Sequence, residues 1–92
     1  MIKVVVNRFG YTEQLLGRMP TKLRDVIEPM LAGVPEASRQ LSRGNAVTAF
    51  RLLREAGNIT VKPCTGYTKE MLLSMAFNAL PPEFRLSDID AD

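Results

Sequence analysis

The chain of 92 residues contains no histidine and only one cysteine, Cys64. Histidine is the most common general base and metal ligand in proteins, and a catalytic cysteine usually needs a histidine partner. The acidic side chains are scattered over the helical segments, so no two carboxylates are spaced for acid–base catalysis and no cluster has the spacing of zinc ligands. These absences predict a protein that is not an enzyme and that holds no metal and no cofactor.

A single cysteine also excludes a disulfide within the chain, whereas small secreted domains usually depend on several. Long apolar runs are absent as well. A signal peptide needs an apolar core of about 7–15 residues and a membrane span needs about 18 or more, and no segment reaches either length. We therefore expect a cytoplasmic protein without a membrane segment, in the host cytoplasm if a phage encodes it.

The charges are distributed unevenly along the chain, although the net charge is only +2. Residues 1–80 carry 11 Lys/Arg against 6 Asp/Glu, a net charge of +5. Residues 81–92 carry a net charge of −3, from Arg85 against Glu83, Asp88, Asp90 and Asp92. A basic body with an acidic tail can bind an anionic partner, or the tail can fold back on the body. The length predicts one domain, residues 1–92, with residues 81–92 as a partly docked acidic tail.

Two short β-branched runs predict strands at about residues 2–6 and 59–62. Helical spacing is clearest from Thr21 to Ala32, where apolar residues recur at i, i+3, i+4, i+7 and i+8 and form one stripe, Leu23, Val26, Ile27, Met30 and Leu31. Pro29 lies inside this segment, lacks an N–H and crowds the carbonyl four residues earlier. A kink or break is therefore expected near residues 25–28.

Capping residues and apolar spacing predict further helices at residues 12–19, 36–43, 45–56 and 68–80. The fold class that these elements predict is α+β, with two short strands packed against three to five short helices in the order β-α-α-α-β-α. Two short strands do not make a stable sheet alone. They need helices on one face or strands from another chain, which leaves a homodimer open.

Four methionines fall on the predicted apolar helix faces, Met19, Met30, Met71 and Met75. Methionines at such positions usually fill gaps in a core. An exposed, methionine-rich docking groove is the alternative.

A basic segment in the middle of the chain is the best candidate for a binding site. Arg39 and Arg43 are four residues apart and Arg51 and Arg54 are three apart, so each pair shares a helix face. Arg, Gln and Asn side chains bond phosphates and base edges, and guanidinium groups also grip the carboxylates of acidic protein surfaces. The predicted partner-binding residues are Arg39, Gln40, Arg43, Asn45, Arg51 and Arg54. The alternative is a solvated helix face with an Arg51–Glu55 ion pair.

The sequence fits neither a phosphate-binding loop nor a helix-turn-helix motif. Residues 65–69 open a helix but lack the glycine spacing of a phosphate-binding loop. A helix-turn-helix centred on Gly66 puts Pro63 inside its first helix, and one centred on Gly44 puts Arg39 and Arg43 where apolar or small residues are needed.

The segment LGRMPTKLR at residues 16–24, after the opening strand, resembles tail-completion proteins of long-tailed phages. No site or partner is transferred from this resemblance, because the pattern has no continuation after Gly33.

The sequence as a whole favours a small non-enzymatic protein that binds a larger protein or ribonucleoprotein through the arginine-bearing helical face, such as a phage-encoded inhibitor or assembly factor. The alternatives are a nucleic-acid-binding regulator, which could be dimeric, and a structural subunit that assembles by sharing strands or helices.

Overall fold

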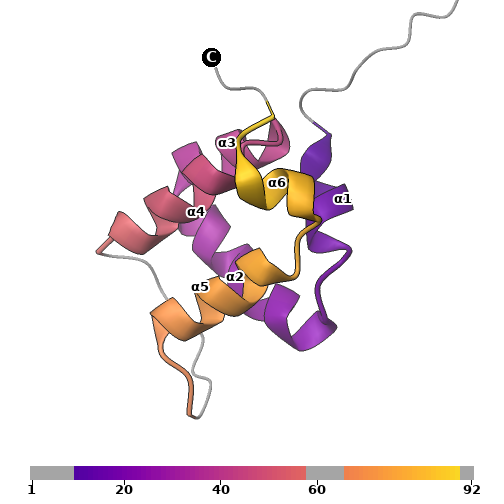
Figure 1. Cartoon of the computed structure of the whole chain (residues 1–92). Helices are drawn as coiled ribbons and strands as arrows, with labels where there is room; N and C mark the ends of the chain where they lie inside the picture. Colours follow the sequence, from indigo (N-terminus) through magenta and orange to yellow (C-terminus); the bar gives the residue numbers. More distant parts are fainter. Residues whose placement is uncertain (1–9, 58–65, 90–92) are drawn as a thin grey trace, which may run out of the picture.

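The computed structural model describes residues 10–57 and 66–89, and both ranges are helical (Figure 1). The helices are α1 (Tyr11–Leu16), α2 (Thr21–Gly33), α3 (Pro35–Ser42), α4 (Ala46–Glu55), α5 (Lys69–Asn78) and α6 (Pro82–Leu86). Neighbouring helices pack as α3 on α4, α2 on α5, and α4 on α5, while α1 and α2 also contact α3 and α6 contacts α4. The result is an all-α arrangement around one hydrophobic core.

The predicted α+β class is wrong for this protein. Six helices and no strand occupy residues 10–57 and 66–89, and four of the helices precede residue 58, so the order β-α-α-α-β-α does not hold. The expected strands at 2–6 and 59–62 lie outside the described residues. The physical reason for the error is that the strand prediction depended on short β-branched runs, whose local preference is weak. The helices bury their apolar faces against one another without needing a sheet.

The apolar stripe of α2 was predicted correctly. All five of its residues are buried, Leu23, Val26, Ile27, Met30 and Leu31. The expected break before Pro29 is wrong, because α2 is one α-helix from Thr21 to Gly33 with Pro29 inside it. Pro29 is exposed, so the carbonyl that loses its hydrogen bond lies on the solvent side. The buried stripe lies on the other side of the helix, packed in the core.

Two aromatic contacts connect helices that are far apart in sequence. The rings of Phe50 on α4 and Phe77 on α5 meet edge to face, with centroids 5.4 Å apart. Those of Tyr11 on α1 and Phe84 on α6 do the same, also at 5.4 Å. Such pairs contribute about 0.5–1.5 kcal/mol beyond their burial. The second contact fastens the C-terminal segment to the first helix.

The described part of the C-terminal segment, residues 81–89, packs against the body, where Phe84 is buried. Helix α6 lies beyond the helix expected at residues 68–80, and Pro82 begins it at a position where proline's fixed φ is suitable. Asp88 then accepts hydrogen bonds from the backbone N–H of Thr48 (3.2 Å) and from the Thr48 hydroxyl. Thr48 lies in the first turn of α4, so the tail supplies a carboxylate where that helix has unpaired N–H groups.

Candidate binding surfaces

The turn between α3 and α4 is held by a chain of hydrogen bonds. Gly44 has a positive φ of 87°, and the Asn45 backbone N–H donates to the Gln40 carbonyl over 2.8 Å. The Asn45 side chain is buried and its Nδ2 donates to Gln40 Oε1 (2.7 Å) rather than capping α4. Gln40 Nε2 in turn donates to Glu36 Oε2 (2.8 Å). Two predicted partner-binding residues, Gln40 and Asn45, therefore have a structural role in this turn.

Arg39 is exposed but already has an anionic neighbour. Its Nη2 lies 2.6 Å from Glu36 Oε1, one turn earlier on α3. Hydrogen bonds from Gln40 and Arg39 lower the pKa of the Glu36 carboxyl below its usual value near 4.5. Arg43 is half-buried at the end of α3, where its backbone N–H donates to the Arg39 and Gln40 carbonyls. This end of the predicted site is thus partly neutralised.

Arg51 and Arg54 have a different environment on α4. Both side chains are exposed, and neither forms an ion pair within residues 10–57 and 66–89. The predicted Arg51–Glu55 pair is therefore not formed. The Arg54 guanidinium lies over the Phe77 ring, with its carbon 5.9 Å from the ring centroid. A cation–π contact of this kind orients the guanidinium while its N–H groups still point to solvent.

Lys69 caps the C-terminal end of α4. Lys69 Nζ donates to the carbonyl of Ala56 over 2.5 Å and to that of Arg54 over 3.4 Å. The last carbonyls of a helix carry partial negative charge, so a cation there stabilises the helix. Lys69 also places a positive group beside Arg54, since its ammonium donates to the backbone carbonyl of that residue.

The six predicted residues do not form one cluster. Arg54 lies nine residues after Asn45, which at 1.5 Å per residue is about 13 Å along the axis of α4. The structure brings Arg39, Gln40 and Asn45 together at the α3–α4 turn, and it places Arg51 and Arg54 further along α4. The described part of the acidic tail does not neutralise Arg51 or Arg54, because Asp88 bonds to Thr48 instead.

A second exposed surface lies on α5, where an exposed methionine-rich groove was predicted only as the alternative to a methionine core. Three exposed apolar side chains lie on or just before α5, and they are Tyr67 (46% exposed), Met71 (45%) and Met75 (43%). Met19 and Met30 are buried as predicted, but the prediction that Met71 and Met75 belong to the core is wrong, and they fit the alternative of an exposed surface. A pocket of about 210 Å³ opens beside them, lined by Pro20, Lys22, Leu23, Tyr67, Leu72 and Met75.

The sequence did contain a signal for this surface. Helix α5 has six apolar residues among its ten, KEMLLSMAFN, and a surface helix of a small protein can bury only one stripe of its residues. Leu72, Leu73 and Ala76 fill that stripe. The remaining apolar side chains must then be exposed to solvent or covered by something else.

Within residues 10–57 and 66–89, no three acidic or cysteine side chains come together as metal ligands would. None of the helices described there is long and apolar enough to cross a membrane. The chain matches no known protein family, no curated protein and no solved structure.

Proposed function

We propose that the protein binds an acidic surface of a larger protein or ribonucleoprotein through the exposed face of α4, with Arg51 and Arg54 as the principal contacts and Arg39 and Arg43 at its edge. The observation that carries this proposal is that Arg51 and Arg54 are exposed and lack a carboxylate partner in the described structure. Guanidinium groups form paired hydrogen bonds with carboxylates, which gives them both affinity and orientation.

The support for α4 makes this face a rigid platform. Asp88 holds the first turn of the helix, Lys69 holds its last carbonyls, and Phe50 anchors its middle in the core. Preorganised side chains lose less entropy on binding than mobile ones. Inhibitors and assembly factors act in this way, by occupying a surface, and the low cysteine content suits such a role in the cytoplasm.

The proposal is tested by affinity capture from cells of the native host, read by mass spectrometry. The bait with Arg39, Arg43, Arg51 and Arg54 replaced by Ala should lose its partner while its circular dichroism stays helical. Arg18→Ala is a control for charge, because Arg18 is exposed in the turn after α1, away from this face. Unchanged capture by the fourfold variant would reject the assignment.

The same experiment series separates a protein partner from a nucleic acid. Binding to duplex DNA weakens with salt, because each neutralised phosphate releases counterions and adds about −0.9 to the slope of log K against log salt. Titrations of duplex and single-stranded DNA and RNA at two salt concentrations measure that slope. Under the proposal these titrations give no specific signal. A steep slope that is lost in the fourfold variant would instead assign α4 to nucleic acid.

A further inference from the structure

The chain that follows α6 runs back to the turn between α3 and α4 (Figure 1). The backbone N–H of Ile89 donates to the carbonyl of Gly44 over 3.3 Å. One residue earlier, the Asp88 carboxylate accepts hydrogen bonds from the N–H of Thr48 (3.2 Å) and from its hydroxyl. Residues 87–89, which we call the docked end, therefore lie against the α3–α4 turn and the first turn of α4.

The absence of a side chain at residue 44 allows this close approach. A Cβ atom added to Gly44 would lie 3.1 Å from the Cβ of Ile89 and 3.1 Å from the Cδ2 of Tyr11. Both distances are shorter than ordinary contacts between carbon atoms, so the docked end packs into the space that only glycine leaves open. The docked end therefore has a specific seat on the turn.

The α3–α4 turn joins the two halves of the arginine face. By this name we mean two arginines near the end of α3 and two on α4, which are Arg39, Arg43, Arg51 and Arg54. Thr48 and Arg51 are three residues apart on α4, so their side chains are neighbours on the helix surface. Since Asp88 is bonded to Thr48, it places a carboxylate at the junction of the two halves.

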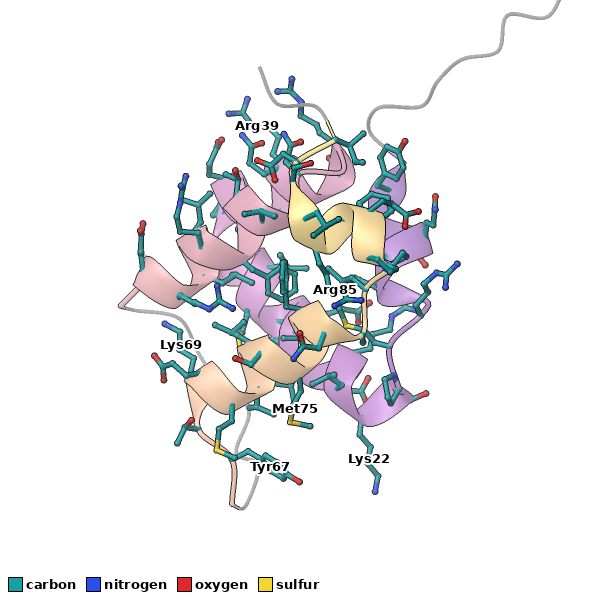
Figure 2. All side chains as sticks on the ribbon, in the orientation of Figure 1. Lys22, Arg39, Tyr67, Lys69, Met75 and Arg85 are labelled. Atoms are coloured by element: carbon teal, nitrogen blue, oxygen red, sulfur yellow. The ribbon has the colours of Figure 1, made fainter. Side chains whose placement is uncertain are left out.

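The positive charge of the C-terminal segment is directed elsewhere. Arg85 Nε donates to the carbonyl of Leu80 over 3.0 Å. Figure 2 shows Arg85 between α6 and α5, whereas Arg39 lies at the other side of α6, beside α3. Arg85 and Asp88 form no ion pair among the described residues. The carboxylate at the junction is therefore not neutralised by Arg85.

The docked end can leave its seat without disturbing the core. Helix α6 ends at Leu86, and the backbone of Ser87 is already extended, so the bonds of residues 88 and 89 are not needed to form the helix. Phe84 is buried and holds α6 on the body independently of these bonds. Ile89 is 46% exposed even when docked, so its release uncovers little apolar surface.

We propose that the docked end is an autoinhibitory contact, which an acidic partner must displace in order to bind the whole arginine face. The inference rests on the function proposed above and adds a regulation of the same surface. An acidic surface that reaches the arginines of both helices has to cross the turn that the docked end covers, and the carboxylate of Asp88 repels other carboxylates there. The apparent affinity is then reduced by the fraction of molecules in which the docked end is released.

The inference is tested with a short polyglutamate peptide that carries a fluorophore, and binding to the full chain is measured by fluorescence anisotropy. At about 0.15 M salt, charges more than about 8 Å apart are largely screened, so distant charges have little effect. Asp88→Ala should bind the peptide about 2- to 30-fold more tightly than the wild type, the range expected when a contact as strong as a helix cap is removed.

Two further variants separate release of the docked end from a simple change of charge. Thr48→Val removes the hydroxyl that donates to Asp88 and leaves the net charge unchanged, and it should also bind the peptide more tightly. Glu83→Ala is the matched control, because it removes the same charge as Asp88→Ala from an exposed position on α6 and should leave the affinity nearly unchanged. The double variant Thr48→Val/Asp88→Ala should gain no more than Asp88→Ala alone, since both changes break one contact.

Hydrogen exchange gives a direct measure of the displacement. Saturation of the wild type with the peptide should increase exchange at the Ile89 amide, because its bond to the Gly44 carbonyl opens. The amide of Leu53, in the buried part of α4, should not change. Unchanged exchange at Ile89 under saturation would mean that the docked end stays in place, and would overturn the inference.

The affinities distinguish failure of this inference from failure of the proposed function. Peptide binding that requires Arg51 and Arg54, but is equal in the wild type, Asp88→Ala and Thr48→Val, would reject autoinhibition and leave the proposed function standing. An equal gain in Glu83→Ala and Asp88→Ala would indicate a general effect of charge and also reject autoinhibition. No binding by either the wild type or Asp88→Ala would reject the proposed function, and this inference with it.

Discussion

Helices α4 and α5 have ten residues each and pack against each other, yet their outer faces differ in chemistry. Helix α4 buries one clean stripe, Ala46, Ala49, Phe50 and Leu53, and turns its arginines to solvent. Helix α5 buries Leu72, Leu73 and Ala76 and still exposes Met71 and Met75. Helix α4 therefore has an apolar inner face and a charged outer face, as is typical of a surface helix. Helix α5 has more apolar side chains than its contacts within one molecule cover.

The two helices are also capped in different ways. The first turn of α5 is capped locally, because the Thr68 hydroxyl accepts a hydrogen bond from the Met71 N–H (3.1 Å). The first turn of α4 receives the carboxylate of Asp88, 40 residues later in the chain. A local cap depends only on the neighbouring sequence, whereas the cap of α4 depends on the tertiary docking of the tail. Measurements of stability in variants of both helices can therefore show whether the two caps differ in solution as they do in the structure.

The largest difference is expected between a buried and an exposed apolar residue. Phe50→Ala removes a fully buried ring that also contacts Phe77, and should lower the free energy of unfolding by about 3–5 kcal/mol. Met71→Ala, at a site 45% exposed, should change it by no more than about 0.5 kcal/mol. Urea denaturation followed by circular dichroism measures both. A large loss in Met71→Ala would mean that the α5 stripe is packed in solution.

Phe50 and Met71 also show what the sequence could predict. On α4 the apolar and charged residues alternate with helical spacing, and this spacing agrees with the buried set Ala46, Ala49, Phe50 and Leu53. On α5 six of the ten positions are apolar, and spacing alone did not separate the buried Leu72 from the exposed Met71 and Met75. Periodicity identifies a buried face only where the opposite face is polar.

For the candidate site, the sequence could predict which individual side chains are exposed, but not how side chains bond to one another. Arg51 and Arg54 are exposed as the spacing predicted, because their positions on α4 alternate with buried ones. The turn-forming roles of Gln40 and Asn45 were not predictable, since they arise from the geometry around Gly44. The bond between Asp88 and Thr48 was equally hidden, because sequence gives no indication of contacts between residues so far apart.

The next largest effect is expected at the distant cap of α4. Asp88→Ala removes the acceptor for the Thr48 N–H and hydroxyl, and should lower stability by up to about 2 kcal/mol, the upper range for helix caps. Faster hydrogen exchange at the Thr48 amide should accompany the loss, because that amide loses its bond. Asp88→Asn, which keeps an acceptor oxygen, should retain most of the stability. Equal stability of Asp88→Ala and wild type would mean that the tail is not docked in solution.

A smaller effect is expected at the local cap of α5. Thr68→Ala removes the oxygen that accepts from the Met71 N–H and should cost about 1 kcal/mol of unfolding free energy. Thr68→Ser retains that oxygen and serves as the control. Hydrogen exchange should increase only in the first turn of α5, whereas Asp88→Ala should also affect α6. Increased exchange in α6 of the Thr68→Ala variant would contradict a purely local cap.

The smallest effect on stability is expected at acid pH. The α3–α4 turn contains a titrating group, Glu36, whereas the α5 surface depends on apolar contacts. Hydrogen bonds from Gln40 and Arg39 lower the pKa of Glu36 in the folded state, so the unfolded chain binds that proton more tightly. The stabilisation from Glu36 is therefore present above its unfolded pKa and is lost as the pH falls through the lowered folded pKa. In denaturant titrations from neutral pH to acid, Glu36→Gln should be less stable than wild type near neutrality and equal to it in acid. A flat difference for Glu36→Gln would mean that the Glu36–Arg39–Gln40 network does not persist in solution.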